Sequence, residues 1–175
     1  MDSNKKRLLI ETAERLDDIA GGLDPRGFCV ENVEVYPEGQ LMKEIRTFIN
    51  YPQKELAPAI GISAPSLSAH EKRQSVNNDI MSKFYNATQI DPWNFDVIRN
   101  ALSILKIDLN TLMDNPNKAI EELQRRKKRM EELSRQAVTE GITHRISELS
   151  TPSIMKVLDY VRLLQLAEEE DKKPS

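Results

Sequence analysis

The chain has 175 residues, of which 39% are hydrophobic, 30% are charged and 5% are aromatic. This composition is typical of a soluble helical protein and disfavours a β-sandwich, so we expect an all-α fold. The net charge of −3 disfavours a protein that coats nucleic acid indiscriminately, because such proteins carry excess lysine and arginine over much of their surface. Any contact with DNA must therefore be local.

The sequence indicates neither export nor a metal site. No apolar run approaches the roughly 18 to 20 residues that span a bilayer, and Cys29 is the single cysteine, so no disulfide is expected within the chain. No second thiol or histidine cluster has metal-ligand spacing, and we expect no metal and no other cofactor. The sequence indicates a cytoplasmic protein with a reduced thiol.

The first 38 residues are predicted to form an amphipathic helix and a loop. Apolar residues recur at helical spacing between residues 5 and 20, and Gly21-Gly22 favours an end to that helix. The stretch 24–38 contains prolines and imperfect alternation, and it is predicted to be a loop or one irregular strand.

Three helices are predicted next, over 39–50, 53–60 and about 64–72. Gly61 allows a sharp turn between the second and the third, and Ser63 is well placed to cap the third. The pattern is therefore that of two short helices joined by a glycine-containing turn.

The rest of this region contains further helix signals. Residues 73–90 are polar with a small apolar cluster, and we expect an insertion with one or two helical turns beside the core. Asp91-Pro92 is typical of a helix start, and Asp108 is expected to cap a short helix that ends near Leu112. Together with the three helices before them, these elements define a domain over 39–115.

Residues 116–175 are predicted to form a helical region for dimerisation or interaction. A first apolar stripe is expected to end at Gly141, and the basic run Arg125–Arg129 interrupts it. We interpret that run as an exposed helix face with i,i+4 ion pairs in preference to a second DNA patch. A last helix is predicted from Thr151-Pro152, and its apolar stripe needs a partner surface: Ile154, Val157, Leu158, Val161 and Leu164.

The stretch from Gly39 to Met113 resembles the Cro/repressor (XRE-like) family of helix-turn-helix regulators. The spacing carries the resemblance: an arginine seven residues before Gln-x-x-Leu-Ala, then Gly-x-Ser-x-x-x-Leu-Ser-x-x-Glu. The matching residues are Gly39, Met42, Ile45, Arg46, Gln53, Leu56, Ala57, Gly61, Ser63, Leu67, Ser68 and Glu71. The resemblance implies a five-helix domain in which Arg46 and Glu71 form a partly buried ion pair; two solvated charges are the alternative.

The resemblance also implies which residues contact double-stranded DNA. Gln53 would bring its amide and a helix N-terminus to a phosphate, and the third helix would lie in the major groove. The implied contact residues are Gln53, Ser63, Ala64, Pro65, Ser66, Ala69, Lys72, Arg73, Asn77 and Lys83. The sequence departs from the family here, because Ala64, Pro65 and Ala69 cannot make the bidentate hydrogen bonds that read guanine or adenine.

The leading hypothesis is a bacterial or phage transcriptional regulator, a repressor by analogy, that binds operator DNA as a homodimer. The alternative is a helix-turn-helix scaffold that acts through a regulatory protein or peptide, as in an antitoxin or a partner-dependent regulator. An enzyme is disfavoured, because no phosphate-binding glycine loop is present and neither His70 nor His144 has an obvious nucleophile partner.

Overall fold

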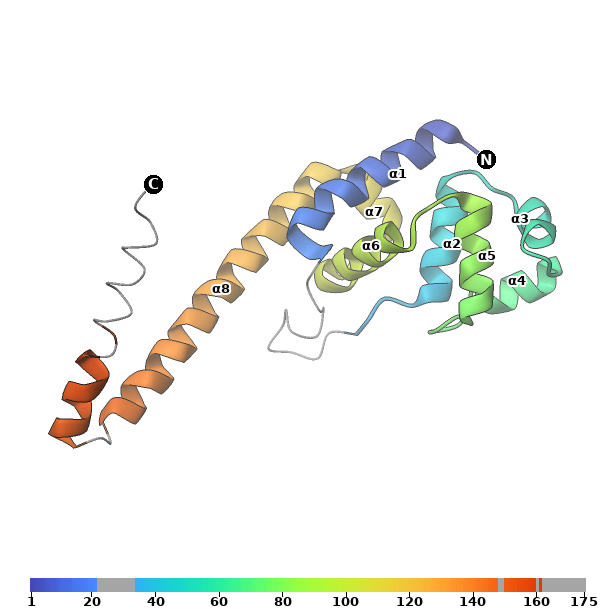
Figure 1. Ribbon diagram of the computed structural model, residues 1–175. Coiled ribbons are helices and arrows are strands. Elements are labelled where there is room, and N and C mark those ends of the chain that lie inside the picture. Colours follow the sequence, from blue (N-terminus) through green and yellow to red (C-terminus); the bar gives the residue numbers. More distant parts are fainter. Residues whose placement is uncertain (22–33, 148–149, 160, 162–175) are drawn as a thin grey trace, which may run out of the picture. The chain divides into compact units, whose positions relative to one another are not determined.

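The computed structural model describes residues 1–21, 34–147, 150–159 and 161. Within these residues the secondary structure is helical and contains no strand, so the predicted all-α class is confirmed (Figure 1). The chain divides into two compact units, Met1–Met130 and Glu131–Ser175. The sequence placed the boundary at residue 115, whereas the first unit also includes the start of the last long helix.

In its described residues the first unit contains the helices α1 to α8, and α8 continues past Met130 into the second unit. The helix α1 continues directly into a π-helical turn, η1, and the remaining elements follow in chain order. Their bounds are α1 Ser3–Leu16, η1 Asp17–Gly21, α2 Glu38–Phe48, α3 Gln53–Ala59, α4 Ala64–His70, α5 Asn78–Thr88, α6 Pro92–Leu105, α7 Leu109–Asp114 and α8 Pro116–Ser147.

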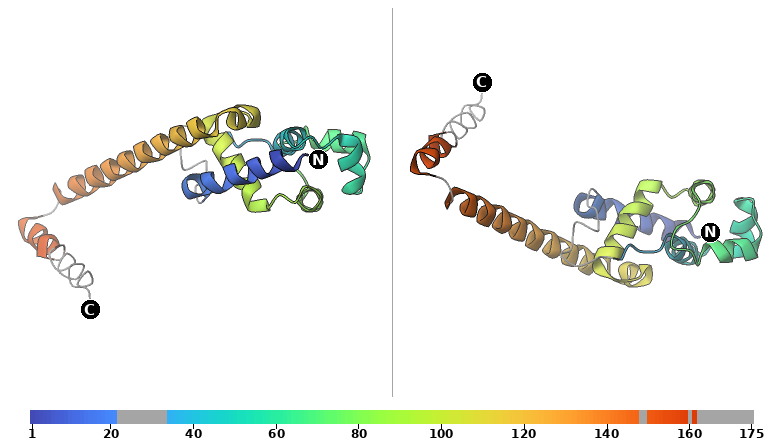
Figure 2. Two further views of the ribbon diagram at one scale, coloured as in Figure 1. Left: turned by 90° about the horizontal axis from the view of Figure 1, so that it is seen from above. Right: turned by 90° about the horizontal axis from the view of Figure 1, so that it is seen from below.

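The helix α1 is part of the main core. Its apolar stripe, Leu9, Ala13 and Leu16, is fully buried, and the helix packs against α6 in both views (Figures 1 and 2). The Asp2 side chain caps α1, and the Asp2 amide donates to the Ile49 carbonyl at the end of α2 over 2.7 Å. The N-terminal helix therefore stabilises the same unit that contains α2 to α7.

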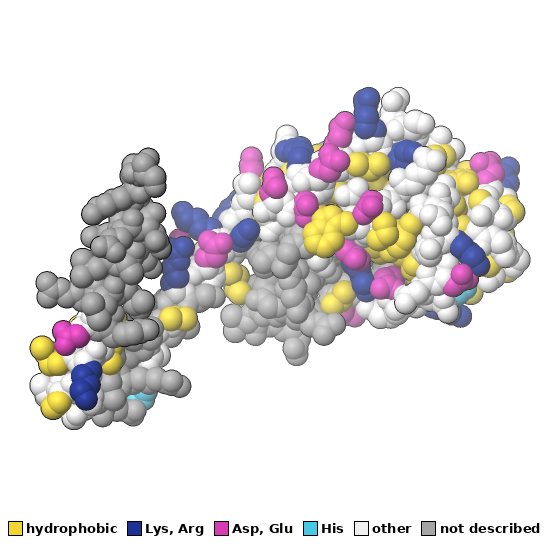
Figure 3. All heavy atoms as spheres, viewed as in Figure 1, with side chains coloured by type: hydrophobic (Ala, Val, Ile, Leu, Met, Phe, Trp, Pro, Cys, Tyr) yellow, Lys and Arg dark blue, Asp and Glu magenta, His cyan; other side chains and the backbone are white. Residues whose placement is uncertain are grey.

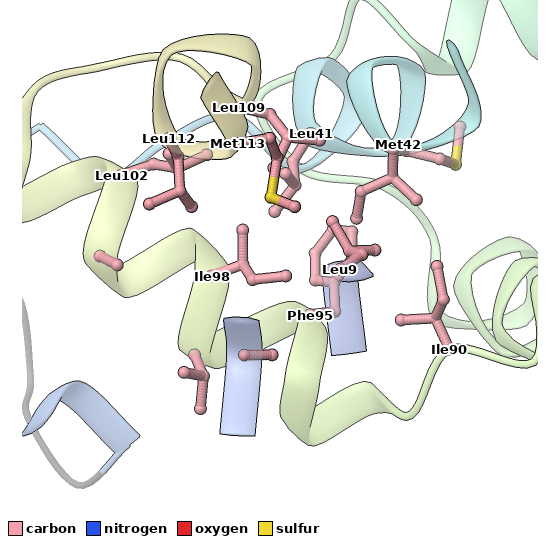
Figure 4. Packing of buried hydrophobic residues seen from close by; sticks show 14 of the residues in the cluster. Leu9, Leu41, Met42, Ile90, Phe95, Ile98, Leu102, Leu109, Leu112 and Met113 are labelled. Atoms are coloured by element: carbon pink, nitrogen blue, oxygen red, sulfur yellow. The ribbon is translucent and has the colours of Figure 1, made fainter. Parts of the chain in front are cut away.

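The centre of the first unit lies where α1, α2, α6 and α7 meet (Figure 4). Leu41 of α2 lies above Ile98 of α6 in this view, and Leu112 and Met113 of α7 lie on the same side of the cluster. The caps that the sequence indicated are present, because the Asp91 side chain accepts from the Trp93 amide and the Asp108 side chain from the Thr111 amide. Two carboxylates thus fix where α6 and α7 begin.

Two predictions about helix boundaries are wrong. The segment 73–90 is not an insertion beside the core, because it contains the 11-residue helix α5, and Ile80, Met81 and Phe84 are buried in the core. Gly141 does not end a helix, since α8 runs through it to Ser147. Nothing lies within 4 Å of the position where a side chain at Gly141 would begin, so a regular helix passes this point without a clash.

The second unit exposes several large apolar side chains. Leu133 and Val138 are exposed on α8, and Leu158 and Val161 are exposed at and just beyond the short helix 151–159. Ile154 and Val157 are half-buried, whereas Leu164 lies outside the described residues. The predicted last helix is thus present from residue 151. No helix in the described part of the chain is long and apolar enough to cross a bilayer.

Candidate nucleic-acid interface

The helices α3 and α4 form a compact pair joined by a four-residue turn. Gly61 has a φ of +74°, a left-handed conformation that glycine adopts at no steric cost. The Ile62 amide donates to the Ala57 carbonyl over 2.9 Å, and the Ser63 hydroxyl accepts from the Ser66 amide to cap α4. This turn re-aims the chain between two short helices, as the positions of Gly61 and Ser63 predicted.

Apolar side chains hold α3 and α4 together. Leu56, Ala57 and Leu67 are fully buried, and Ile60 is 1% exposed. A small residue at position 57 allows the two helices to approach closely, because interiors pack at near-crystalline density and leave no room for a longer side chain. The pair is therefore a rigid unit that presents its outer surface at the end of the first unit (Figure 1).

A buried ionic network fastens α4 to α2. The Arg46 Nε lies 2.6 Å from Glu71 Oε1, and the Arg46 and Glu71 side chains are only 12% and 3% exposed. The Arg46 Nη2 donates to Glu71 Oε2 as well, and its Nη1 donates to the Tyr51 carbonyl. The ion pair that the resemblance implied is thus present and buried, so the alternative of two solvated charges does not hold.

The side chain of Gln53 belongs to this network. Its Nε2 donates to Glu71 Oε2 over 2.6 Å, in a partly buried position. The sequence interpretation placed this amide on a DNA phosphate; the structure instead uses its N–H group to satisfy Glu71.

The exposed surface of α4 is small and uncharged. Ser63, Pro65 and Ala69 are exposed, while Ala64 and Ser66 are partly exposed. His70 is also partly buried, and its Nδ1 has no hydrogen-bond partner among the described residues. A surface of methyl and hydroxyl groups offers few donors or acceptors for base edges.

Cations gather immediately after α4. Lys72 and Arg73 are exposed, and from Gln53 to Arg73 the exposed charges are Lys54, Lys72 and Arg73 against Glu55, since Arg46 and Glu71 neutralise each other. Elsewhere on the face in view, Lys and Arg side chains are interspersed with Asp and Glu side chains (Figure 3). The α3–α4 surface is therefore a local cationic region on an acidic chain.

Two other predicted contact residues have structural partners. The Asn77 side chain caps α5 by accepting from the Asp79 amide over 2.8 Å, and Lys83 pairs with Asp79 at 2.7 Å on the exposed face of α5. Both side chains are exposed, and both residues follow Lys72 and Arg73 in the chain. An exposed i,i+4 pair is weak, so Lys83 can exchange this partner for another anion.

The segment after α4 is held against α2 by contacts that the sequence interpretation missed. The Glu38 and Gly39 amides donate to the Gln74 and Arg73 carbonyls, each over 3.1 Å. The Glu38 carboxylate also accepts from Arg99 at 2.8 Å and from the Val76 amide. Glycine was recognised at position 39, but its partners are 34 or more residues away in sequence, where no local pattern points to them.

A second network joins Tyr36, just before α2, to the middle of that helix and to α7. The Tyr36 hydroxyl donates to Glu44 at 2.8 Å, and Glu44 Oε2 accepts from the Leu109 amide at the start of α7. Burial and the neighbouring Glu44 carboxylate raise the pKa of the Tyr36 phenol well above its usual value, so the phenol keeps its proton. These contacts link α2 to α7 and fix the platform behind α3 and α4.

The basic run Arg125–Arg129 is partly used within its own unit. Arg125 and Arg126 both pair with Glu122, at 3.0 Å and 2.9 Å, and the Arg126 Nη1 donates to the Ile104 carbonyl near the end of α6. The Arg126 pair has the i,i+4 spacing that the sequence interpretation expected, whereas the Arg125 pair is i,i+3.

Comparison of the chain with models of known protein families, with curated proteins and with solved structures gives no match. In the described part of the chain, no group of three or more His, Cys, Asp or Glu side chains is arranged to hold a metal ion. The interpretation of the α3–α4 surface therefore depends on its own geometry and charge.

Proposed function

We propose that this protein is a DNA-binding transcriptional regulator of the helix-turn-helix type, acting through α3 and α4. The observation that carries the proposal is the α3–turn–α4 unit, with its left-handed Gly61 and its buried Arg46–Glu71 pair. In helix-turn-helix proteins the second helix lies in the major groove with its first residues at the base edges. The first turn of α4, from Ser63 to Ser66, takes that position here.

Phosphate contacts supply most of the affinity in this proposal. Lys54, Lys72 and Arg73 are exposed at the two ends of the α3–α4 unit, where cations can reach the backbones that flank a groove. Such contacts position the protein without reading sequence, and they make binding strongly dependent on salt.

Sequence is read in this proposal through methyl and hydroxyl contacts. Ala64, Pro65 and Ala69 present apolar surface that matches the C5-methyl group of thymine, and Ser63 and Ser66 present hydroxyls. Replacing thymine by uracil within a bound site removes that methyl group without changing base pairing. We expect uracil at those positions to lower the affinity. Equal affinity for the two bases would contradict the reading of thymine methyl groups by α4.

A dimer compensates for weak reading by each subunit. Two recognition helices on one face of DNA lie about 34 Å apart and contact two half-sites, and the second contact is gained at high effective concentration. The exposed apolar residues of the second unit, Leu133, Val138, Met155, Leu158 and Val161, are the surface through which we expect the two copies to associate. Occupation of a promoter by this dimer would repress transcription.

Salt-dependent binding of the full chain to duplex DNA tests the proposal. The logarithm of the binding constant should fall linearly with the logarithm of salt concentration, with a slope of about −0.9 for each phosphate contacted. Lys72→Ala with Arg73→Ala should weaken binding and reduce the slope by about 2 per subunit. Lys118→Ala with Lys128→Ala removes two exposed cations from α8 and is the matched control.

Each outcome of this titration has one meaning. A salt-independent interaction, or one that the α8 control weakens as much as the Lys72 and Arg73 pair does, contradicts DNA binding through α3 and α4. If the control alone weakens binding, the basic run on α8 is the DNA patch instead.

The second candidate is a protein-interaction scaffold, and the same exposed apolar residues of the second unit favour it. On this reading the surface from Leu133 to Val161 binds a different protein, and α3 and α4 have only a structural role. The titration distinguishes the two, because a scaffold of this kind shows no steep loss of DNA affinity with salt. A mass measurement of the free protein then reports whether the second unit pairs with its own copy.

A further inference from the structure

A hollow lies between α2 and the segment that follows α4. Lys43 of α2 and Lys72 both line it, together with the polar and apolar residues Pro37, Gln40, Glu44, Glu71 and Gln74. Lys43 was not among the residues that the sequence assigned to DNA contact. The hollow therefore brings a second cation, from a different helix, to the end of the proposed interface.

The backbone fixes this juxtaposition tightly. At Gly39, a Cβ atom would lie 2.2 Å from the His70 carbonyl oxygen and 2.8 Å from the Arg73 carbonyl oxygen. Only a glycine allows α2 to approach the end of α4 this closely, and the hydrogen bond from the Gly39 amide to the Arg73 carbonyl holds the two segments together. Lys43 is one helical turn after Gly39, on the side that lines the hollow.

The acids and amides that line the hollow are already engaged. Glu71 accepts from Arg46 and Gln53, and Glu44 accepts from the Tyr36 hydroxyl, the Gln40 amide and the Leu109 backbone. The Gln74 amide donates to the Val35 carbonyl over 2.9 Å.

The two lysines, by contrast, have no ion-pair or hydrogen-bond partner for their ammonium groups among the described residues. The lining itself has two lysines and two carboxylates, and the charge of Glu71 is compensated by Arg46, which pairs with it from outside the lining. An anion that enters the hollow thus meets two free ammonium groups without displacing an existing contact.

We propose that Lys43 and Lys72 together bind one phosphate of the DNA strand that flanks the major groove. This inference rests on the proposed function and deepens it, because it assigns a second helix to the DNA interface. Lys72 directly follows the proposed recognition helix, so a phosphate beside that helix is within the region that both lysines line. Two cations from separate segments on one phosphate fix the register of α4 along the groove.

A phosphate-neutralisation scan tests the shared site. A duplex that the protein binds is made with a neutral methylphosphonate at each phosphate in turn, and binding of the full chain is measured for each duplex. The parent protein should bind more weakly when the phosphate that contacts Lys43 and Lys72 is neutralised, and there should be one such phosphate in each half-site. Lys43→Ala and Lys72→Ala should each weaken binding to the unmodified duplex and lower the salt slope by about 1 per subunit.

The decisive result is the position of the phosphate whose neutralisation no longer weakens binding by each variant. Both variants should become insensitive to neutralisation at the same phosphate, whereas Lys118→Ala should keep the full response there. If Lys43→Ala keeps the parent profile, or the two variants lose their response at different phosphates, the shared site is wrong while DNA binding through α4 stands. If no duplex is bound at all, the proposed function fails, and this inference fails with it.

Discussion

Removing the Glu71 carboxylate should destabilise the protein more than any exposed charge does. Glu71 is 3% exposed and accepts hydrogen bonds from the Arg46 Nε, the Arg46 Nη2 and the Gln53 Nε2. In Glu71→Ala the Arg46 guanidinium stays largely buried, with the Tyr51 carbonyl as its remaining partner. Leaving one buried charge unpaired costs about 3 to 5 kcal/mol, which is a large part of a typical unfolding free energy of about 5 to 15 kcal/mol.

Urea unfolding followed by circular dichroism measures this cost. A matched control is Glu11→Ala, whose pair with Arg7 spans 3.5 Å and is 58% to 74% exposed. We expect the control to change the free energy of unfolding by about 0.3 to 0.5 kcal/mol. If Glu71→Ala costs no more than Glu11→Ala, the buried network does not fasten α4 to α2.

The double variant separates the charge from the packing. Arg46→Met with Glu71→Leu replaces both charged groups by apolar side chains of similar volume, and such replacements are often neutral or stabilising. We therefore expect the double variant to recover most of the stability that Glu71→Ala loses. A double variant as unstable as Glu71→Ala would show that shape at this contact, and not the unpaired charge, sets the cost.

Three further predictions concern backbone and pH. Gly39→Ala should lower the free energy of unfolding in urea by about 1 to 3 kcal/mol, because the new Cβ meets backbone oxygen at 2.2 Å. Its control is Gly141→Ala, in open space within α8, which should keep more helix than the parent protein as the temperature rises. Gly61→Ala should cost about 1 to 2 kcal/mol, since its φ of +74° strains a side chain, and no measurable cost would contradict the left-handed turn. Desolvation raises the pKa of the Asp96 carboxyl in the folded protein although the residue is exposed, so its ionisation costs a small amount of folding free energy as pH rises through that raised pKa. Asp96→Asn should therefore be more stable than the parent at neutral pH but not below the ordinary pKa of aspartate, near about 3.9; a stability difference that does not change with pH would contradict this.

Local signals predicted the helix starts well. Ser63, Asp91 and Asp108 were recognised as caps from sequence, and the side chain of each accepts a hydrogen bond from a backbone amide in the first turn of its helix. A cap acts within three residues, so its pattern is complete in a short window. The same holds for Gly61, whose turn is made by its immediate neighbours.

Signals that depend on distant partners were missed. The helix α5 was predicted as an insertion because its polar residues dominate locally, while Ile80, Met81 and Phe84 become informative only once the core they enter is known. Gly141 was predicted to end a helix because glycine is common there, but nothing in this chain forces a turn at that point. Propensity is a weak prior where tertiary context decides.

The candidate site was predicted in outline but not in its connections. The pairing of Arg46 with Glu71 followed from the family resemblance, whereas the hydrogen bond of Gln53 to Glu71 did not. The role of Glu38, which joins α6 to the segment after α4 through Arg99 and Val76, depends on residues 38 to 61 positions away. Such contacts exist only in three dimensions, and no spacing rule along the chain reveals them.

Selection of duplexes from a random library by the full chain tests whether α4 is a recognition helix. We expect an enriched inverted repeat whose half-site centres are about 10 base pairs apart, because two α4 helices would read successive major grooves. We also expect that substituting Ser63 and Ser66 by alanine changes the selected bases. Recovery of no preferred sequence, or of the same sequence by a chain whose α4 surface has been altered, would contradict α4 as the recognition helix.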